Sequence, residues 1–99
     1  MNQELEIKHD KVNQRFNLFV SDVEAGEIIY EFRDSKMAIT HTKIKDGYEG
    51  KGLAKLLVEF AVNYARENKL KIIPICPYVK KIMERTEKFQ DMLWVSEIK

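Results

Sequence analysis

The amino-acid sequence predicts an α+β fold with a mixed sheet: a meander of four antiparallel strands, a helix, a parallel fifth strand and a second helix. Residues 5–44 contain short segments rich in aromatic and β-branched residues, separated by brief turns. Apolar residues then recur at three- and four-residue spacing, which indicates a helix. Another apolar strand follows, and a helix that crosses between two strands of one sheet leaves them parallel.

The four strands of the first half are expected over residues 5–9, 15–20, 28–33 and 37–44. The first alternates apolar and polar residues, which is typical of a half-buried strand. Turns are expected at residues 24–27, where Gly26 stands, and at residues 34–36. Such short connections predict that neighbouring strands run antiparallel.

The main helix is expected from about Gly50 to Asn68, with Asn68 ending it in a left-handed conformation. A fifth strand is expected over residues 70–75. Proline is favoured at the first position of a helix, so Pro77 predicts a second helix with Cys76 as its N-cap, extending to about residue 87. The apolar residues near Trp94 predict a docked C-terminal segment.

Length and composition limit the classes of function. A chain of 99 residues is expected to form one domain over residues 1–99. Lys and Arg number 17 and Asp and Glu number 16, and this balance predicts no nucleic-acid partner. The sequence contains no run of about 18 apolar residues, so it predicts no membrane span. The single cysteine fits a reducing, cytoplasmic setting. Balanced charge and the lack of an exposed apolar stripe favour a monomer.

A glycine-rich stretch joins the fourth strand to the main helix. Gly47, Gly50 and Gly52 are three of the four glycines in the chain. Their spacing is neither the dinucleotide-binding pattern nor a P-loop. One interpretation is an Asp-Gly turn before an ordinary helix start. The other is a phosphate site, because the start of a helix presents unpaired N–H groups and a positive dipole end.

The segment Gly50-Lys51-Gly52, between a strand and a long helix, resembles the acetyl-CoA signature of the Gcn5-related N-acetyltransferases, Gln/Arg-x-x-Gly-x-Gly/Ala. Gly47 occupies the first position, where the family usually has Gln or Arg. His41-Thr42 before the loop and Cys76-Pro77-Tyr78 after it resemble a branch of very small members. The resemblance covers roughly residues 37–90.

The resemblance implies a GNAT-like fold and an acetyl-CoA site, with transfer of the acetyl group to an unidentified small or protein amine. The pyrophosphate would bind backbone N–H groups of the loop, and the pantetheine would lie between the fourth and fifth strands. Lys51 and Lys55 would add positive charge, whereas Glu49 would oppose an anion unless it points away. The implied cofactor-binding residues are Ile44, Glu49, Gly50, Lys51, Gly52, Leu53, Ala54 and Lys55.

The candidate catalytic residues are Cys76, His41 and Tyr78, and each has a structural alternative. Cys76 is either a small buried residue or a nucleophile that a helix dipole activates to accept the acetyl group. His41, expected on the same strand face as Ile39 and Lys43, is either structural or a general base. Tyr78 either packs on the sheet or protonates the departing thiolate. Tyr48 and Phe89 are expected only to pack. One cysteine and two separated histidines predict no metal site.

Two other functions remain open. The chain could be an acyl-CoA-binding or regulatory module without catalysis, which Gly47 in place of Gln or Arg favours. It could also be an interaction domain that binds no CoA.

Overall fold

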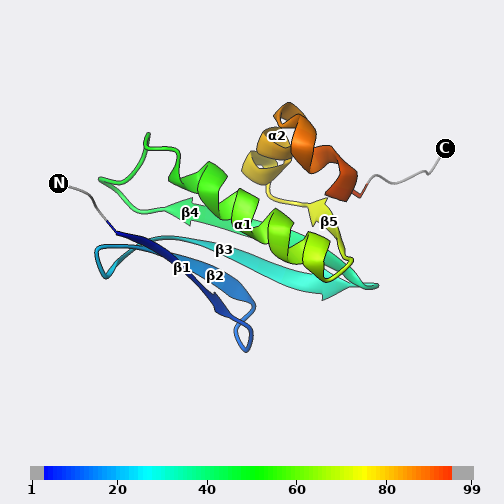
Figure 1. Ribbon diagram of the computed structural model, residues 1–99, viewed down its shortest axis with the longest axis horizontal. Helices are drawn as coiled ribbons and strands as arrows, with labels where there is room; N and C mark the ends of the chain where they lie inside the picture. Colours follow the sequence, from blue (N-terminus) through cyan, green and yellow to red (C-terminus); the bar gives the residue numbers. More distant parts are fainter. Residues whose placement is uncertain (1–3, 95–99) are drawn as a thin grey trace.

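The computed structural model describes residues 4–94. Its centre is a five-stranded sheet whose spatial order follows the chain (Figure 1). Strands β1 to β4 pair antiparallel, and β5 is parallel to β4. The predicted α+β class with a mixed sheet is therefore confirmed. The strands are β1 (Leu5–Asp10), β2 (Arg15–Val20), β3 (Val23–Arg33), β4 (Lys36–Ile44) and β5 (Lys71–Pro74).

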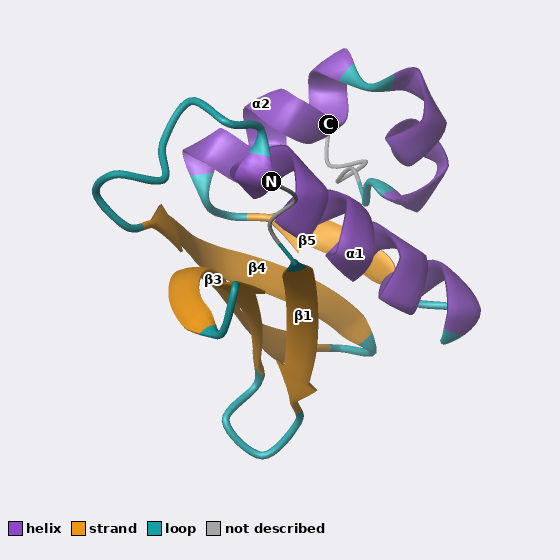
Figure 2. Cartoon of the chain, turned by 60° about the vertical axis from the view of Figure 1, so that its left-hand side comes forward, coloured by secondary structure: helices purple, strands orange, loops and turns teal. Residues whose placement is uncertain are grey.

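The helices lie on one face of this sheet (Figures 1 and 2). Helix α1 (Leu53–Glu67) crosses from β4 to β5, α2 (Pro77–Arg85) follows β5, and a 3₁₀ helix, η1 (Glu87–Met92), continues the chain. Within residues 4–94 no helix covers the opposite face, and no helix is long and apolar enough to span a membrane. We call the uncovered side the helix-free face.

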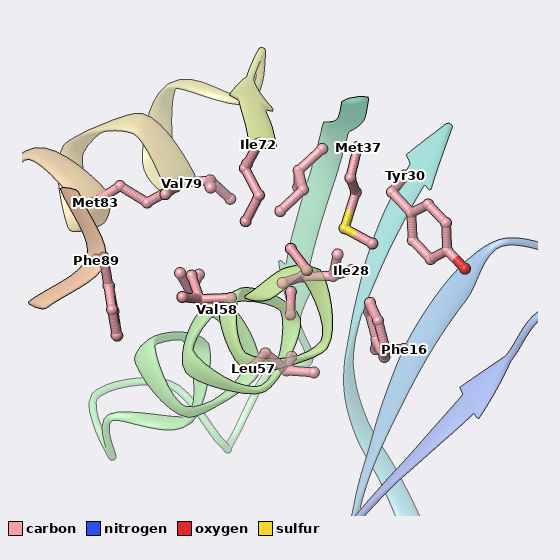
Figure 3. Packing of buried hydrophobic residues seen from close by; sticks show 14 of the residues in the cluster. Phe16, Ile28, Tyr30, Met37, Leu57, Val58, Ile72, Val79, Met83 and Phe89 are labelled. Atoms are coloured by element: carbon pink, nitrogen blue, oxygen red, sulfur yellow. The ribbon is translucent and has the colours of Figure 1, made fainter. Parts of the chain in front are cut away.

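The hydrophobic core fills the space between the helices and the sheet. Figure 3 shows side chains from the sheet, such as Phe16 and Ile72, gathered against Leu57 and Val58 of α1. Phe89 of η1 is also almost completely buried, which confirms the packing role expected for it. Because both helices contribute to a single core, the packing fixes where each of them begins relative to the sheet.

The predicted turn at residues 24–27 is wrong. The chain reverses at Ser21 and Asp22, whose φ angles are 49° and 70°, and residues 24–27 lie within β3. Gly26 serves close packing instead. A Cβ atom at this position would lie 2.6 Å from Ile44 Cδ1 and 3.0 Å from the Lys43 carbonyl oxygen. A glycine can therefore mark a close approach between strands as well as a turn.

Strand β4 contains a bulge. Ile29 pairs with His41, but Tyr30 pairs with Ile39, so Thr40 is an extra residue. Its Oγ1 donates to the Ile29 carbonyl oxygen at 3.3 Å. An extra residue reverses the alternation of side chains, and the expectation that His41 shares a face with Ile39 is therefore wrong.

The helix ends also differ from expectation. Helix α1 begins at Leu53, because Gly52 (φ 76°) is in a left-handed conformation and acts as its N-cap. At the other end Asn68 has φ −102°, and Lys69 (φ 58°) takes the left-handed position. The Leu70 N–H then donates to the Ala65 carbonyl at 2.8 Å, closing a Schellman turn.

The second helix begins as predicted, with Cys76 as N-cap and Pro77 at its first position. It ends at Arg85, slightly before the expected residue 87. The docked C-terminal segment is confirmed as far as Trp94, whose N–H donates to the Ile72 carbonyl at 2.8 Å. The rest of that expected segment, residues 95–99, lies outside the described residues.

Candidate functional site

A cavity of about 340 Å³ opens where β4, the glycine loop, α1 and α2 meet. It lies on the helix-covered side of the sheet, because it is walled by the first turn of α1. Each of these elements contributes side chains or backbone to it. The lining residues are Thr42, Ile44, Tyr48, Glu49, Gly50, Gly52, Leu53, Ala54 and Tyr78.

The glycine loop holds three left-handed residues. Gly47, Gly50 and Gly52 have φ angles of 90°, 78° and 76°. Residues with a Cβ atom rarely adopt such angles, so the backbone path itself favours glycine. Apart from the glycine itself and the two residues adjacent to it, no atom lies within 4 Å of the position that a Cβ would take at any of the three. The space beside them is therefore open to an approaching group.

The start of α1 provides hydrogen-bond donors. The first turn of a helix leaves its N–H groups unpaired, and here the Leu56 N–H, which donates to the Gly52 carbonyl at 3.1 Å, closes that turn. Within residues 4–94 no backbone acceptor pairs with the N–H groups of Leu53, Ala54 and Lys55. The first turn carries no acidic residue. This arrangement favours an anion at the cavity.

Beyond the cavity one edge of β4 is open. The pairing of β4 with β5 ends at Ile39 and Pro74, and the N–H groups of Ile75 and Cys76 then both donate to the Ile39 carbonyl, at 3.1 and 3.0 Å. β4 continues to Ile44. Its backbone groups alternate between the two edges. The Lys45 N–H bonds to Ala25 of β3, so alternation turns the backbone of Thr42 and Ile44 to the open edge.

Cys76 and Tyr78 lie where β4 and β5 separate. Cys76 is half-buried with a free thiol, and its side chain makes no capping hydrogen bond. Tyr78 lines the cavity and is 52% exposed. Such exposure leaves its ring available to a ligand, in addition to any packing on the sheet.

His41 lies on the other side of the sheet. Thr42 and Ile44 face the cavity, so alternation along the strand turns His41 and Lys43 to the helix-free face. His41 is exposed there. The structure therefore does not bring it to the cavity wall with Tyr78, and only an acceptor that reaches the open edge of β4 from the helix-free face would meet it.

The cavity brings together most of the predicted cofactor-binding residues and not the two lysines. Lys51 and Lys55 are exposed and do not line it. Glu49 does line it, so its charge faces the region that favours an anion. The lining residues predicted for the cofactor are Ile44, Glu49, Gly50, Gly52, Leu53 and Ala54.

Two lining residues, Tyr48 and Thr42, were missing from the sequence prediction. Tyr48 was expected only to pack, and it both packs against the core and lines the cavity. Thr42 follows His41 directly, and only the bulge in β4 decides which of the two faces the cavity. The alternation along a strand predicts that two adjacent residues such as His41 and Thr42 point to opposite faces of the sheet, but not which of them points to the cavity.

His9, which shows no partner in the sequence, forms a separate aromatic cluster. Its Nε2 lies 2.5 Å from the Tyr30 hydroxyl, and its ring stacks on Phe16 with centroids 4.2 Å apart. Tyr64 of α1 meets it edge-on at 4.5 Å. Burial and the nearby Lys11 lower the pKa of His9, while Asp10 opposes this shift.

Comparison with known proteins agrees with the fold. A family model described as GCN5-related N-acetyl-transferase matches residues 15–92. Protein NATD1 of Gallus gallus is 26% identical over 82 residues, which cover 81% of this chain and 74% of that protein. NATD1 of Homo sapiens has the same identity over the same length.

Two solved structures are similar to the chain. A GCN5-like protein of Staphylococcus aureus, determined by NMR, has a TM-score of 0.75 and 35% identity, covering 94% of this chain and 91% of that one. The ribosomal-protein-alanine N-acetyltransferase of Brucella melitensis biovar Abortus 2308 has a TM-score of 0.59 at 18% identity, covering 86% and 64%, and shares the fold. Since the family model spans residues 15–92, the chain belongs to the GCN5-related N-acetyltransferase family.

Proposed function

We propose that this protein binds acetyl-CoA at the cavity and transfers the acetyl group to an amine. One observation carries the proposal: unpaired N–H groups at the start of α1 open onto a cavity that continues to the open edge of β4. Acetyl-CoA, when bound, supplies an acetyl group activated as a thioester. The remaining chemistry rests on the residues of this chain.

The cavity suits the chemical groups of CoA in order. The N–H groups of Leu53, Ala54 and Lys55 are suited to the pyrophosphate. The backbone edge at Thr42 and Ile44 offers a donor and an acceptor to the amides of the pantetheine arm. Glu49 acts against the anion, and the exposed Lys51 and Lys55 offset its charge in solution.

We assign three residues to the reaction. Cys76 lies at the fork between β4 and β5, and its Sγ would accept the acetyl group as the CoA thiolate leaves. Tyr78 lines the cavity and would pass the proton lost by the Cys76 thiol to that thiolate, which leaves as free CoA. An amine that approaches from the helix-free face would then attack the acetyl carbon and displace Cys76 as the thiolate, and His41 would take the proton that the amine loses.

Intact mass spectrometry after incubation with acetyl-CoA tests the covalent step. The wild type is expected to gain one acetyl group and to lose it on addition of an accepting amine, whereas Cys76→Ala gains none. The control is Cys76→Ser, which keeps the size of the side chain. Acetylation that persists in Cys76→Ala would exclude Cys76 as the acceptor. Turnover of an amine by Cys76→Ala would indicate direct transfer.

A non-catalytic acyl-CoA-binding module is the second candidate. The placement of His41 on the face opposite the cavity favours it, as does Gly47 at the first position of the signature. This candidate predicts that acetyl-CoA perturbs the amide resonances of Lys51 to Leu53, with neither a stable acetyl adduct nor turnover on a panel of small and peptide amines. An interaction domain without CoA predicts no perturbation at millimolar acetyl-CoA.

A further inference from the structure

Thr42 carries a buried hydroxyl without a partner. Its Oγ1 is inaccessible to solvent, and no atom of the described chain forms a hydrogen bond with it. Within residues 4–94 one other buried side-chain atom lacks a hydrogen bond, Arg15 Nε. The guanidinium group of Arg15 is nevertheless paired, because its Nη1 lies 3.1 Å from Glu27 Oε1. Thr42 therefore has the only buried hydroxyl of the described residues that remains unpaired.

The other threonine of the same strand does have a hydrogen-bond partner within the chain, so the lack of a partner is specific to Thr42. Thr40 stands two residues earlier on the same strand, and its Oγ1 donates to the Ile29 carbonyl. A buried hydroxyl without a hydrogen bond destabilises a fold, because it loses its contacts with water and gains none. A valine at position 42 would have nearly the same shape without that penalty. We therefore expect the hydroxyl of Thr42 to form a hydrogen bond with a group from outside the chain.

The position of Thr42 indicates where that partner comes from. The residue lines the cavity together with Leu53 and Ala54, and it lies on the stretch of β4 that β5 leaves unpaired. Rotation about χ1 by one rotamer carries Oγ1 to the place that the methyl group occupied. The hydroxyl can thus turn toward a ligand that lies along the open edge without a change in the backbone.

We propose that the Thr42 hydroxyl forms a hydrogen bond with an amide group of the pantetheine arm of bound acetyl-CoA. This inference rests on the proposed function and adds a specificity-determining side chain to it. A hydroxyl can donate to an amide carbonyl or accept from an amide N–H. A ligand with an alkyl chain in place of the pantetheine amides would leave the Thr42 hydroxyl unpaired. Thr42 therefore favours ligands that carry an amide beside it over ligands that carry an alkyl chain there.

The test measures affinity and stability in the same variants. Thr42→Val is expected to weaken acetyl-CoA binding by about five- to tenfold in calorimetric titration, since one neutral hydrogen bond is lost and the ligand amide stays unpaired. Unfolding of the unliganded variant is expected at the same or a higher urea concentration than for the wild type. Thr42→Ser should retain the affinity, because it keeps the hydroxyl.

Thr40→Val provides the matched control. It removes a hydroxyl that is already bonded within the chain, so it should lower stability and leave the affinity for acetyl-CoA unchanged. Thr42→Ala replaces the valine variant if the latter does not fold. A merely structural role of Thr42 would instead give the same pattern as Thr40: lower stability with unchanged affinity. That outcome overturns the inference.

A CoA fragment separates this inference from the proposed function. Adenosine 3′,5′-bisphosphate lacks the pantetheine arm, so wild type and Thr42→Val should bind it equally. If the wild type fails to bind acetyl-CoA, the proposed function is wrong and the inference falls with it. If the wild type binds acetyl-CoA and Thr42→Val binds it equally well, only the inference about Thr42 is wrong.

Discussion

Gly47 and Gly52 form a natural pair of test positions in the glycine loop. Both have positive φ angles, 90° and 76°, and at both the position that a Cβ would take is more than 4 Å from every atom outside the glycine and its adjacent residues. Gly52 lines the cavity and Gly47 does not. A substitution to alanine therefore causes similar backbone strain at both positions and places a methyl group beside the cavity at only one of them.

We expect Gly47→Ala and Gly52→Ala to lose similar stability, roughly 1–2 kcal/mol each, because an L-residue is strained in this conformation. Only Gly52→Ala should also lose affinity for acetyl-CoA, by tenfold or more, since its methyl group obstructs the approach of the phosphates. Urea unfolding and calorimetric titration provide the two values. Equal affinity of the two folded variants would place the pyrophosphate elsewhere.

His9 makes stability depend on pH. Its lowered pKa means that the folded chain disfavours the imidazolium form, while the unfolded chain titrates near 6.5. Between the lower folded value and 6.5 the unfolded chain binds more protons. The stability that His9 contributes is therefore complete above pH 6.5 and decreases as the pH falls through this range.

We expect the free energy of unfolding to fall between pH 7 and pH 5 in the wild type and to fall less in His9→Gln. Tyr30→Phe removes the hydroxyl that contacts His9 and keeps the histidine, so it should lower stability by about 1 kcal/mol and keep the pH dependence. Urea unfolding at several pH values measures these slopes. Identical slopes for His9→Gln and the wild type would assign the effect to other groups.

At the scale of the element, β3 and β4 are held at close range by Gly26. We expect Gly26→Ala to destabilise the protein by about 1–3 kcal/mol, because its methyl group would overlap the end of Ile44 and crowd the Lys43 carbonyl. Ile44→Val removes the overlapping Cδ1 atom. The double variant should therefore be more stable than the sum of the two single changes predicts.

A double-mutant cycle in urea provides this measurement. Strict additivity of the two changes would show that the backbone contact with Lys43, at 3.0 Å, carries the whole penalty. Because Ile44 lines the cavity, Gly26→Ala should also weaken acetyl-CoA binding, whereas a substitution on β1 such as Lys8→Ala, remote from the cavity, should not.

Local patterns predicted the elements well and their faces poorly. Strand 15–20, the N-cap at Cys76 and the reversal at residues 34–36 agree with the structure, because each depends on neighbouring residues. The turn expected around Gly26 was wrong, because the close approach of Ile44 depends on a residue 18 positions away. The bulge at Thr40 has no local signal, so the residue that faces the cavity could not be chosen from the sequence.

At the scale of the whole molecule, ligand binding should couple to stability. The cavity is built from β4, the loop, α1 and α2, which share one core, so global unfolding destroys it. Acetyl-CoA at 100 times its dissociation constant should add about 2.7 kcal/mol. For a chain of this size that raises the melting temperature by roughly 10–20 °C.

Thermal melts with and without acetyl-CoA check this coupling. Gly52→Ala should show a smaller shift at the same ligand concentration, whereas Gly47→Ala should show the shift of the wild type. A wild-type melting temperature that does not change with ligand concentration would contradict binding at this cavity.

The extra residue in β4 acts on the strand as an insertion acts on a reading frame. Before Thr40 the odd-numbered side chains Met37 and Ile39 enter the core, and after it the even-numbered Thr42 and Ile44 take that side. Removing one residue here would exchange the sides of His41 and Thr42 together. The placement of His41 on one face of the sheet and of Thr42 on the other therefore depends on the presence of one extra residue in the strand, at position 40.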